Sequence, residues 1–354
     1  THEGEGVMRN GKTAFVAGAL PGESIRFRRM RRHRQHDEAQ LVDVLEPSPL
    51  RVPPRCTHFG VCGGCALQHL QPTAQVESKQ AELRDSFERI GRVLPEAWLP
   101  PLRGPEWNYR RRARLGAKYV AKKGRVVVGF RERLSPYVAA LERCEVLAAP
   151  VDALIEPLSR MLTGLAMRER VPQIEVAVAD NAVAMVFRVM QTPPAEDLAA
   201  LRAFEREHGV RVFLQPGGLD SVQRLPPEEG ATVDEPPLHY RLPDFDLTLD
   251  FLPTDFVQVN GALNRALVAR VVELLGLDAG ARVLDLYCGL GNFTLPLARR
   301  AAEVVGLEGS ETLVQRARDN AALNGLAAKT RFEARDLFQL APEDLRALGT
   351  AQRW

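Results

Sequence analysis

Residues 281–300 read ARVLDLYCGLGNFTLPLARR, and this stretch decides the fold that we expect for the C-terminal part of the chain. Its first seven residues are mostly apolar, as in a buried strand, and the glycines at 289 and 291 mark a turn into a helix. Upstream, residues 262–275 have the spacing of an amphipathic helix that would end at Gly276. The stretch therefore predicts a strand, a glycine loop and a helix in succession.

The same alternation continues downstream of the glycine loop. Residues 303–308 (EVVGLE) form a second apolar run that ends at Glu308, nineteen residues after Gly289. A helical segment follows at 311–325, and residues 330–337 lead through a further strand to Asp336. A strand, a glycine loop, a helix and a strand that ends in an acid are typical of a doubly wound nucleotide-binding sheet. The alternative is an α/β core with an ordinary glycine turn.

The glycine loop also indicates the class of ligand. A dinucleotide fingerprint would have a third glycine at position 294, which is Thr294 here, and the following helix begins without a basic residue. A ligand without phosphates fits better, with Glu308 accepting from two ribose hydroxyls and Asp336 near an adenine amine. S-Adenosylmethionine is such a ligand, so we expect a methyltransferase-type site.

Four of the five cysteines form a second pattern. Cys56, Cys62 and Cys65 stand as C-x5-C-G-G-C, and Cys144 follows 78 intervening residues later. Four thiolates suit either Zn²⁺ or an iron–sulfur cluster, and the spacing does not choose between them. Gly63 and Gly64 would let the backbone turn tightly around an ion or cluster. Buried small side chains or disulfides are the alternatives.

Charge divides unevenly along the chain. Residues 1–133 carry 25 lysines and arginines against 14 acidic residues, whereas residues 134–354 carry 22 against 31. Such asymmetry indicates that the first third faces a polyanion such as RNA, with two solvated surfaces as the alternative.

Residues 13–49 read as short strands with Gly and Pro turns, which is typical of a small β-barrel of the OB type. The expected strands are 13–20, 24–32 and 39–48. Six arginines crowd the second strand and its end: Arg26, Arg28, Arg29, Arg31, Arg32 and Arg34. We expect them to follow RNA phosphates, with Phe27 either in the core or stacked on a base. A charged edge strand that prevents aggregation is the alternative.

A second basic segment follows a helix expected at residues 73–91, which Thr73 would cap and Gly91 would end. Residues 103–133 hold 11 lysines and arginines and only 2 acids. Aromatic residues beside arginines are typical of an RNA-contacting strand or loop. The relevant side chains are Trp107, Tyr109, Arg110, Arg111, Arg112 and Arg114.

The remaining chain, residues 145–250, predicts a scaffold of helices (151–168, 196–208) and strands (174–180, 182–190, 210–216, 247–253) without chemical motifs. Hydrophobic residues make up 45% of the chain and charged residues 26%, as in a globular protein. We expect no membrane span and no signal peptide, and the odd cysteine count favours the reducing cytoplasm.

Taken together, several stretches resemble the TRAM-domain RNA uracil-5 methyltransferases, and within that family the type that acts on 23S ribosomal RNA. The matching text is GEGV, FVAGALPGE, C-x5-CGGC-x-LQ, YRRRAR, VGFRER, the distant Cys144, DFVQVN and VLDLYCGLGNFTLPLA. The resemblance implies a multidomain α/β and β protein. Its parts would be a TRAM OB-fold (1–48), a central α+β domain (49–250) and a Rossmann-like S-adenosylmethionine domain (251–354). It also implies that Cys56, Cys62, Cys65 and Cys144 hold a [4Fe–4S] cluster. The tRNA-methylating relatives lack the TRAM part and this cluster.

The resemblance further implies roles for single residues. Gln258 would contact the methionine or ribose part of the cofactor, Tyr287 and Asn292 would line the loop site, and Glu308 would hold the ribose. Asp336 is matched less closely, because the segment around it varies in length. The family attacks uracil C6 with a cysteine thiolate and removes the C5 proton with a base, and both groups are expected beyond Trp354. Cys288 would only pack beside the cofactor, so the catalytic part of the domain is expected to be missing from this chain.

The expected function is therefore methylation of C5 of a uridine in 23S rRNA by a cytoplasmic, monomeric enzyme. Two other classes remain open from the sequence. One is a non-catalytic RNA-binding protein with a structural zinc. The other is an RNA N-methyltransferase, which would need no cysteine nucleophile.

Overall fold

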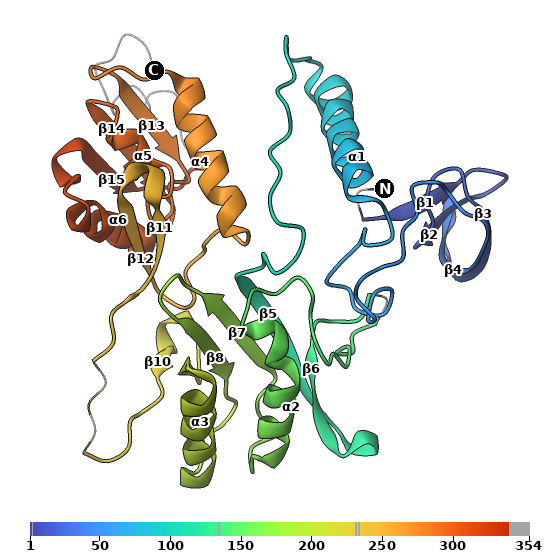
Figure 1. Ribbon diagram of the computed structural model, residues 1–354, viewed down its shortest axis with the longest axis horizontal. Helices are drawn as coiled ribbons and strands as arrows, with labels where there is room; N and C mark the ends of the chain where they lie inside the picture. Colours follow the sequence, from blue (N-terminus) through green and yellow to red (C-terminus); the bar gives the residue numbers. More distant parts are fainter. Residues whose placement is uncertain (2, 134, 231, 233, 340–354) are drawn as a thin grey trace. The chain divides into compact units, whose positions relative to one another are not determined.

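The computed structural model of the protein describes residues 1, 3–133, 135–230, 232 and 234–339, which divide into two compact units (Figure 1). The first unit comprises Thr1–Pro101, Val127–Glu145 and Asp152–Leu158. The second comprises Leu102–Val126, Val146–Val151 and the described residues from Ser159 onward. No helix within these described ranges is long and apolar enough to span a membrane.

The first unit begins with a sheet whose strands run in the order β1-β2-β4-β3. Their bounds are Glu5–Met8, Thr13–Ala17, Ser24–Arg32 and His36–Glu46 for β1 to β4. Strands β2 and β4 are parallel, whereas β1–β2 and β3–β4 are antiparallel. Small apolar residues (Ala14, Val16, Ala19 and Ala39) form its core, and Phe27 packs against them. The three expected strands are present, and Phe27 belongs to the core.

Helix α1 (Pro72–Asp85) follows the cysteine triplet and continues as a π-helical turn, Ser86–Gly91. The end at Gly91 agrees with the sequence, but the expected cap at Thr73 is wrong. Gln71 occupies the N-cap position without a side-chain hydrogen bond, and Pro72 is the first helical residue. Proline favours that position because its φ is already helical and its missing N–H would have no partner there.

The second unit contains a sheet in which β10, β9, β8, β7 and β5 lie side by side. The strands are β5 (Arg112–Val120), β7 (Gln173–Val178), β8 (Val183–Arg188), β9 (Val210–Gln215) and β10 (Gln223–Arg224), with β6 at Arg125–Gly129. Helix α2 (Ile155–Gly164) lies within its expected range, and helix α3 (Ala195–His208) begins one residue before the expected range and ends with it. Strand β5 crosses the second basic segment, which the sequence left open between strand and loop.

The C-terminal part of the second unit has the alternating pattern that the glycine loop predicted (Figure 1, orange to red). A hairpin of β11 (Leu238–Leu242) and β12 (Leu247–Phe251) leads to α4 (Gly261–Leu275), which ends at Gly276. Strands β13 (Arg282–Leu286), β14 (Glu303–Glu308) and β15 (Thr330–Ala334) then form a parallel sheet. Helices α5 (Thr294–Ala298) and α6 (Glu311–Leu323) connect them. Because the strands are parallel, their carboxyl ends meet at one edge, where ligands of doubly wound sheets bind.

Candidate functional site

The loop after β13 has a backbone conformation that requires its glycines. Gly289 and Gly291 have φ values of 56° and 99°, in the left-handed region that glycine adopts without strain. Tyr287 shares this region with φ 60°, which is uncommon for a residue that has a side chain. The amide of Cys288 donates to the carbonyl oxygen of Leu307 at 3.0 Å and ties the loop to β14. The Tyr287 side chain is 58% exposed beside this turn.

Glu308, the last residue of β14, lies against the glycine loop. Its Oε2 accepts the amide proton of Gly289 at 3.1 Å, and its Oε1 accepts that of Ser310 at 3.1 Å. A carboxylate offers about four lone-pair positions, so these two bonds leave room for further donors. Glu308 therefore fixes the loop and can still accept hydrogen bonds from a ligand.

The next strand places a second acid and an aromatic side chain at the same edge. Arg335, directly after β15, donates its amide proton to the carbonyl oxygen of Glu308 at 2.9 Å. Asp336 follows, and its Oδ1 accepts from the amide of Phe338 at 3.1 Å. The Phe338 side chain is 90% exposed, and its ring centroid lies 6.1 Å from that of Tyr287. The sequence analysis did not single out Phe338; its place directly after the acid-bearing strand was the available signal.

Asn292, in the glycine loop, takes part in a buried polar network. Its Oδ1 accepts from the Tyr240 hydroxyl at 2.9 Å and from Asn264 Nδ2 at 2.8 Å, and its Nδ2 donates to Asn264 Oδ1 at 3.0 Å. Tyr240 and Asn264 are buried, and neither was among the expected site residues. No local sequence pattern marks Tyr240 or Asn264 for this role, because β11, α4 and the glycine loop are distant in sequence.

Gln258 lies apart from the loop residues, in a pocket of the second unit. The pocket is lined by Arg111, Val178, Tyr240, Phe251, Val257, Gln258, Gly261, Asn264 and Arg265. Tyr240 and Asn264 thus reach both this pocket and Asn292. The structure brings Tyr287, Asn292, Glu308 and Asp336 to one edge of the sheet, and it connects Gln258 to them through Tyr240 and Asn264.

Comparisons with known proteins point to one family. A family model described as tRNA (Uracil-5-)-methyltransferase matches residues 238–345. A 23S rRNA (uracil(1939)-C(5))-methyltransferase RlmD from Cupriavidus necator is 47% identical over 97% of this chain and 77% of its own length. The enzyme of the same name from Azoarcus sp. is 48% identical over 98% of this chain and 79% of its own. The chain belongs to the RNA uracil-C5 methyltransferase family.

Solved structures agree with this family at the level of the fold. The Pyrococcus abyssi tRNA (uracil-54, C5)-methyltransferase, solved with S-adenosyl-L-homocysteine, covers 96% of this chain with a TM-score of 0.68 and 21% identity, over 81% of its own length. The resemblance drawn from the sequence motifs, and the multidomain α/β architecture that it implied, are therefore confirmed. The methyltransferase family also bears out the expectation of an enzyme.

Cys288 is placed as a packing residue of the methyltransferase loop. Only 4% of its surface is exposed. Burial, with the nearby carboxylates of Asp285 and Glu308, raises the pKa of its thiol to about 12. A thiol in this state is a poor nucleophile near neutral pH.

The arginines of the second basic segment mostly make contacts inside the second unit. Arg111 Nη2 binds Asp180 Oδ1 at 2.5 Å, and Arg114 Nη2 binds Glu175 Oε1 at 2.8 Å. Arg112 donates to the carbonyl oxygen of Pro253, and burial lowers the pKa of its guanidinium. Asp180 also binds Arg265, so it joins the residue directly before β5 to α4. Sequence composition cannot separate such structural arginines from RNA-binding ones.

Strand β3 presents arginines that lack such partners. Arg26, Arg29 and Arg31 pair with Asp43, Asp37 and Glu38 at 2.8, 3.1 and 3.8 Å. The side chains of Arg28, Arg32 and Arg34, the last of which follows β3, are exposed and form no hydrogen bond or close ion pair within the described residues, although the charge of Arg32 helps to lower the pKa of Asp37. Half of the arginine run is therefore available to an external anion.

The four cysteines of the sequence pattern all lie in the first unit, and all five cysteines of the chain are free thiols. Burial, together with the charges that Cys65, Cys144 and Cys56 would carry close by, raises the pKa of the Cys62 thiol to about 11. The structure thus brings Cys144 to the triplet.

Gly63 and Gly64 lie in a turn, as expected, but they are needed there for space and not for a positive φ. A Cβ on Gly63 would lie 3.0 Å from the carbonyl oxygen of Arg131. A Cβ on Gly64 would lie 3.1 Å from the Phe130 ring and 3.4 Å from Cys62 Sγ. Neither glycine has a positive φ. The backbone of the triplet therefore packs directly on the segment 130–133.

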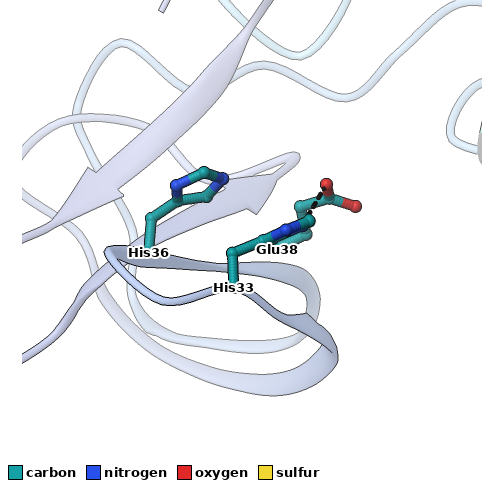
Figure 2. Close-up of side chains that lie close together, drawn as sticks. All are labelled: His33, His36 and Glu38. Atoms are coloured by element: carbon teal, nitrogen blue, oxygen red, sulfur yellow. Dashed lines mark hydrogen bonds and ion pairs between the residues drawn. The ribbon is translucent and has the colours of Figure 1, made fainter.

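Figure 2 shows another group of ligand-type side chains, at the β3–β4 turn. The ligand atoms of His33, His36 and Glu38 all lie within 4.8 Å of one another, and in the part of the chain that is described the cysteines form no such group. The two rings are stacked at 4.6 Å and tilted by 25°, and His33 Nε2 lies 2.9 Å from Glu38 Oε1. Stacked rings do not direct their nitrogen lone pairs at one point. We therefore interpret the group as a stacked, hydrogen-bonded pair and not as a metal site.

Proposed function

We propose that the full-length protein methylates C5 of a uridine in 23S rRNA, with S-adenosylmethionine as the methyl donor. One observation carries the proposal: Glu308 accepts from the amides of Gly289 and Ser310 at the strand ends, in a chain 47% identical over 97% of its length to an RlmD enzyme. When bound, S-adenosylmethionine supplies an electrophilic methyl group.

Five residues would hold this cofactor. Glu308 would accept from the ribose hydroxyls, since its two bonds to backbone amides leave lone pairs unused. Asp336 would face the adenine amine, Tyr287 would contact the cofactor from the loop, and Asn292 and Gln258 would bind its polar groups. The exposed aromatic pair of Tyr287 and Phe338 beside Asp336 supports an aromatic ligand at this edge.

The chemistry requires a nucleophile that these cysteines do not supply. C5 of uracil is a poor nucleophile, so a cysteine thiolate first adds to C6, and a base removes the C5 proton after methyl transfer. Cys288 is buried with a raised pKa, and we assign the other four cysteines to a metal cluster. We therefore propose that the nucleophile and the base lie beyond Trp354.

We further propose that Cys56, Cys62, Cys65 and Cys144 hold a [4Fe–4S] cluster. The mutual effect of the four thiols on the pKa of Cys62 supports a shared site. Four thiolates can hold either a single zinc ion or an iron–sulfur cluster, and the resemblance of the sequence to the cluster-bearing RNA uracil-5 methyltransferases favours the cluster. The cluster would tie Cys144 to the triplet and so hold the loops of the first unit together.

Strand β3 and the turn after it would contact the RNA through Arg28, Arg32 and Arg34, because these side chains are exposed and form no hydrogen bond or close ion pair within the described residues. We also propose the division into a TRAM OB-fold domain (1–48), a central domain (49–250) and a methyltransferase domain (251–354), and a monomer in solution.

The test uses 23S rRNA fragments with 5-fluorouridine, incubated with S-adenosylmethionine and either this chain or a form extended past Trp354. Fluorine at C5 cannot leave as a proton does, so a covalent protein–RNA adduct accumulates and survives a denaturing gel. A shifted band with the extended form alone is expected. A band with the 354-residue chain would assign the nucleophile to one of its own cysteines, and no band with either would exclude uracil-C5 chemistry.

A further inference from the structure

The Tyr240–Asn264–Asn292 network joins three elements of the second unit: strand β11, helix α4 and the glycine loop. Asn264 and Asn292 exchange two amide hydrogen bonds, at 2.8 and 3.0 Å, although 28 residues separate them. The Tyr240 hydroxyl adds a third bond at 2.9 Å. Helix α4 is itself fixed at its start, where the Asn260 side chain accepts from the amide of Leu263 at 3.0 Å. The Asn292 side chain is therefore held by hydrogen bonds to two fixed elements, β11 and α4.

The Asn292 carboxamide has one N–H group that is not used by the network. Its Oδ1 accepts two hydrogen bonds, which use both lone pairs. One of its two N–H groups donates to Asn264 Oδ1. The second N–H has no partner among the described residues, and Asn292 is only partly buried. A single donor is thus presented by a side chain whose other polar positions are all occupied.

Tyr240 decides which way this amide faces. The Asn264–Asn292 pair alone could form with both amides rotated by half a turn, since each side chain offers one donor and one acceptor edge. In that arrangement Asn292 would turn Nδ2 toward Tyr240, and the buried phenol proton would lose its acceptor. Burial raises the pKa of Tyr240, so the hydroxyl keeps this proton. The phenol therefore selects the observed orientation.

We propose that Tyr240 and Asn264 are positioning residues for the cofactor: they hold the Asn292 carboxamide in the one orientation that leaves its second N–H for an acceptor group of S-adenosylmethionine. This inference rests on the proposed function, because it assumes that the glycine loop binds this cofactor. It also explains why the Gln258 pocket and the loop are connected through Tyr240 and Asn264.

The test compares binding of S-adenosylhomocysteine to the full chain by calorimetry. Tyr240→Phe removes one hydroxyl and keeps the ring that packs near Phe251. We expect about fivefold to fiftyfold weaker binding, the range of one buried hydrogen bond. Tyr137→Phe is the matched control, because Tyr137 is 70% exposed in the first unit and should bind as the wild type does. Unchanged binding by Tyr240→Phe would overturn the inference.

A double-mutant cycle separates positioning from general stability. If Tyr240 acts through Asn292, then Tyr240→Phe should weaken binding in the wild type but add nothing in the background of Asn292→Ala. Equal losses in both backgrounds would show that Tyr240 acts elsewhere and would overturn the inference. Should Tyr240→Phe fail to fold, Asn264→Asp replaces it in the same cycle, since aspartate cannot donate to Oδ1. A wild-type chain that binds no S-adenosylhomocysteine would instead refute the proposed cofactor site.

Discussion

At the scale of single residues, Glu308 combines two tasks that are usually described separately. It holds the glycine loop through the amide of Gly289, and it remains available to a ligand. Because the same carboxylate does both, loss of its charge should disturb the loop and the ligand contact together. This coupling distinguishes Glu308 from Asp336, whose side chain accepts only from the amide of Phe338 in the part of the chain that is described.

Glu308→Gln should therefore weaken S-adenosylhomocysteine binding by at least about tenfold. A glutamine has one acceptor oxygen in place of two and turns an NH₂ group toward a backbone N–H, and a charge-assisted bond contributes about 1.5–3 kcal/mol. Calorimetry measures the loss. Glu311→Gln is the control, since Glu311 lies on α6 and pairs only with the exposed Arg318 at 3.1 Å. Equal affinities for wild type and Glu308→Gln would contradict the assigned role.

His69 predicts an acid sensitivity of the first unit. Only 1% of its surface is exposed, and neither ring nitrogen has a hydrogen-bond partner among the described residues. Burial, with the charge of Arg51, therefore lowers its pKa to about 4. The imidazole is then neutral in the folded state but titrates near 6.5 when unfolded. Above pH 6.5 both states are neutral. As the pH falls from 6.5 toward 4, the unfolded state binds the proton first, and stability is lost.

The expected loss approaches about 3 kcal/mol at pH 4, and His69→Phe should remove this part of the pH dependence. Urea unfolding of both proteins at pH 7.5 and pH 5 measures it. His208→Phe, which replaces a half-buried histidine of α3 in the second unit, serves as the comparison. An identical pH dependence in wild type and His69→Phe would show that His69 does not titrate on unfolding.

At the scale of elements, β3 contains its own control for RNA binding. Replacing Arg28, Arg32 and Arg34 by alanine should weaken binding of a 23S rRNA fragment and lower the salt slope by about 2, at roughly 0.7 per phosphate contact with single strands. Replacing the paired set, Arg26, Arg29 and Arg31, should have the smaller effect, because their charges already meet Asp43, Asp37 and Glu38. Filter binding at several salt concentrations measures both slopes, and equal slopes would remove β3 from the interface.

The elements themselves were largely predictable, because their periodicity is local. The expected segment 303–308 is β14 to the residue, and the predicted helix before Gly276 is α4. Strand β11 was missed, since its five residues lie after a proline-rich stretch and pair only with β12. The contacts of Arg111 and Arg112 were also unpredictable, because their partners, Asp180 and Pro253, are 69 and 141 residues away. Side-chain contacts between residues far apart in sequence depend on the fold and cannot be read from composition.

The proposed cofactor site likewise has a part that was predictable from local sequence and a part that was not. Glu308 and the glycine loop follow from strand spacing alone, and the structure joins them. The network of Tyr240, Asn264 and Asn292 depends on three elements meeting in space. No spacing rule connects a tyrosine of a hairpin to an asparagine of a loop 52 residues later.

At the scale of the whole molecule, the proposed metal and RNA contacts lie in one unit and the proposed cofactor site lies in the other. Each has its own apolar core. The cysteine triplet, Cys144 and the arginines of β3 belong to the first unit. The residues proposed to hold the cofactor belong to the second. The chain passes between the units at several points, so sequence-contiguous boundaries describe them only approximately. Loss of the proposed iron–sulfur cluster should therefore destabilise the first unit before the second.

Cys144→Ser tests this division. The variant should lose the cluster, measured as iron and acid-labile sulfide, and its first unit should become more sensitive to proteolysis, because the link between Cys144 and the triplet is gone. Its affinity for S-adenosylhomocysteine should stay within about twofold of the wild type, since all five residues proposed to hold the cofactor lie in the second unit. Cys288→Ser is the matched control and should keep its iron. A Cys144→Ser protein that retains iron would refute the cluster ligands, and a large loss of cofactor affinity would show that the cluster stabilises the methyltransferase site as well.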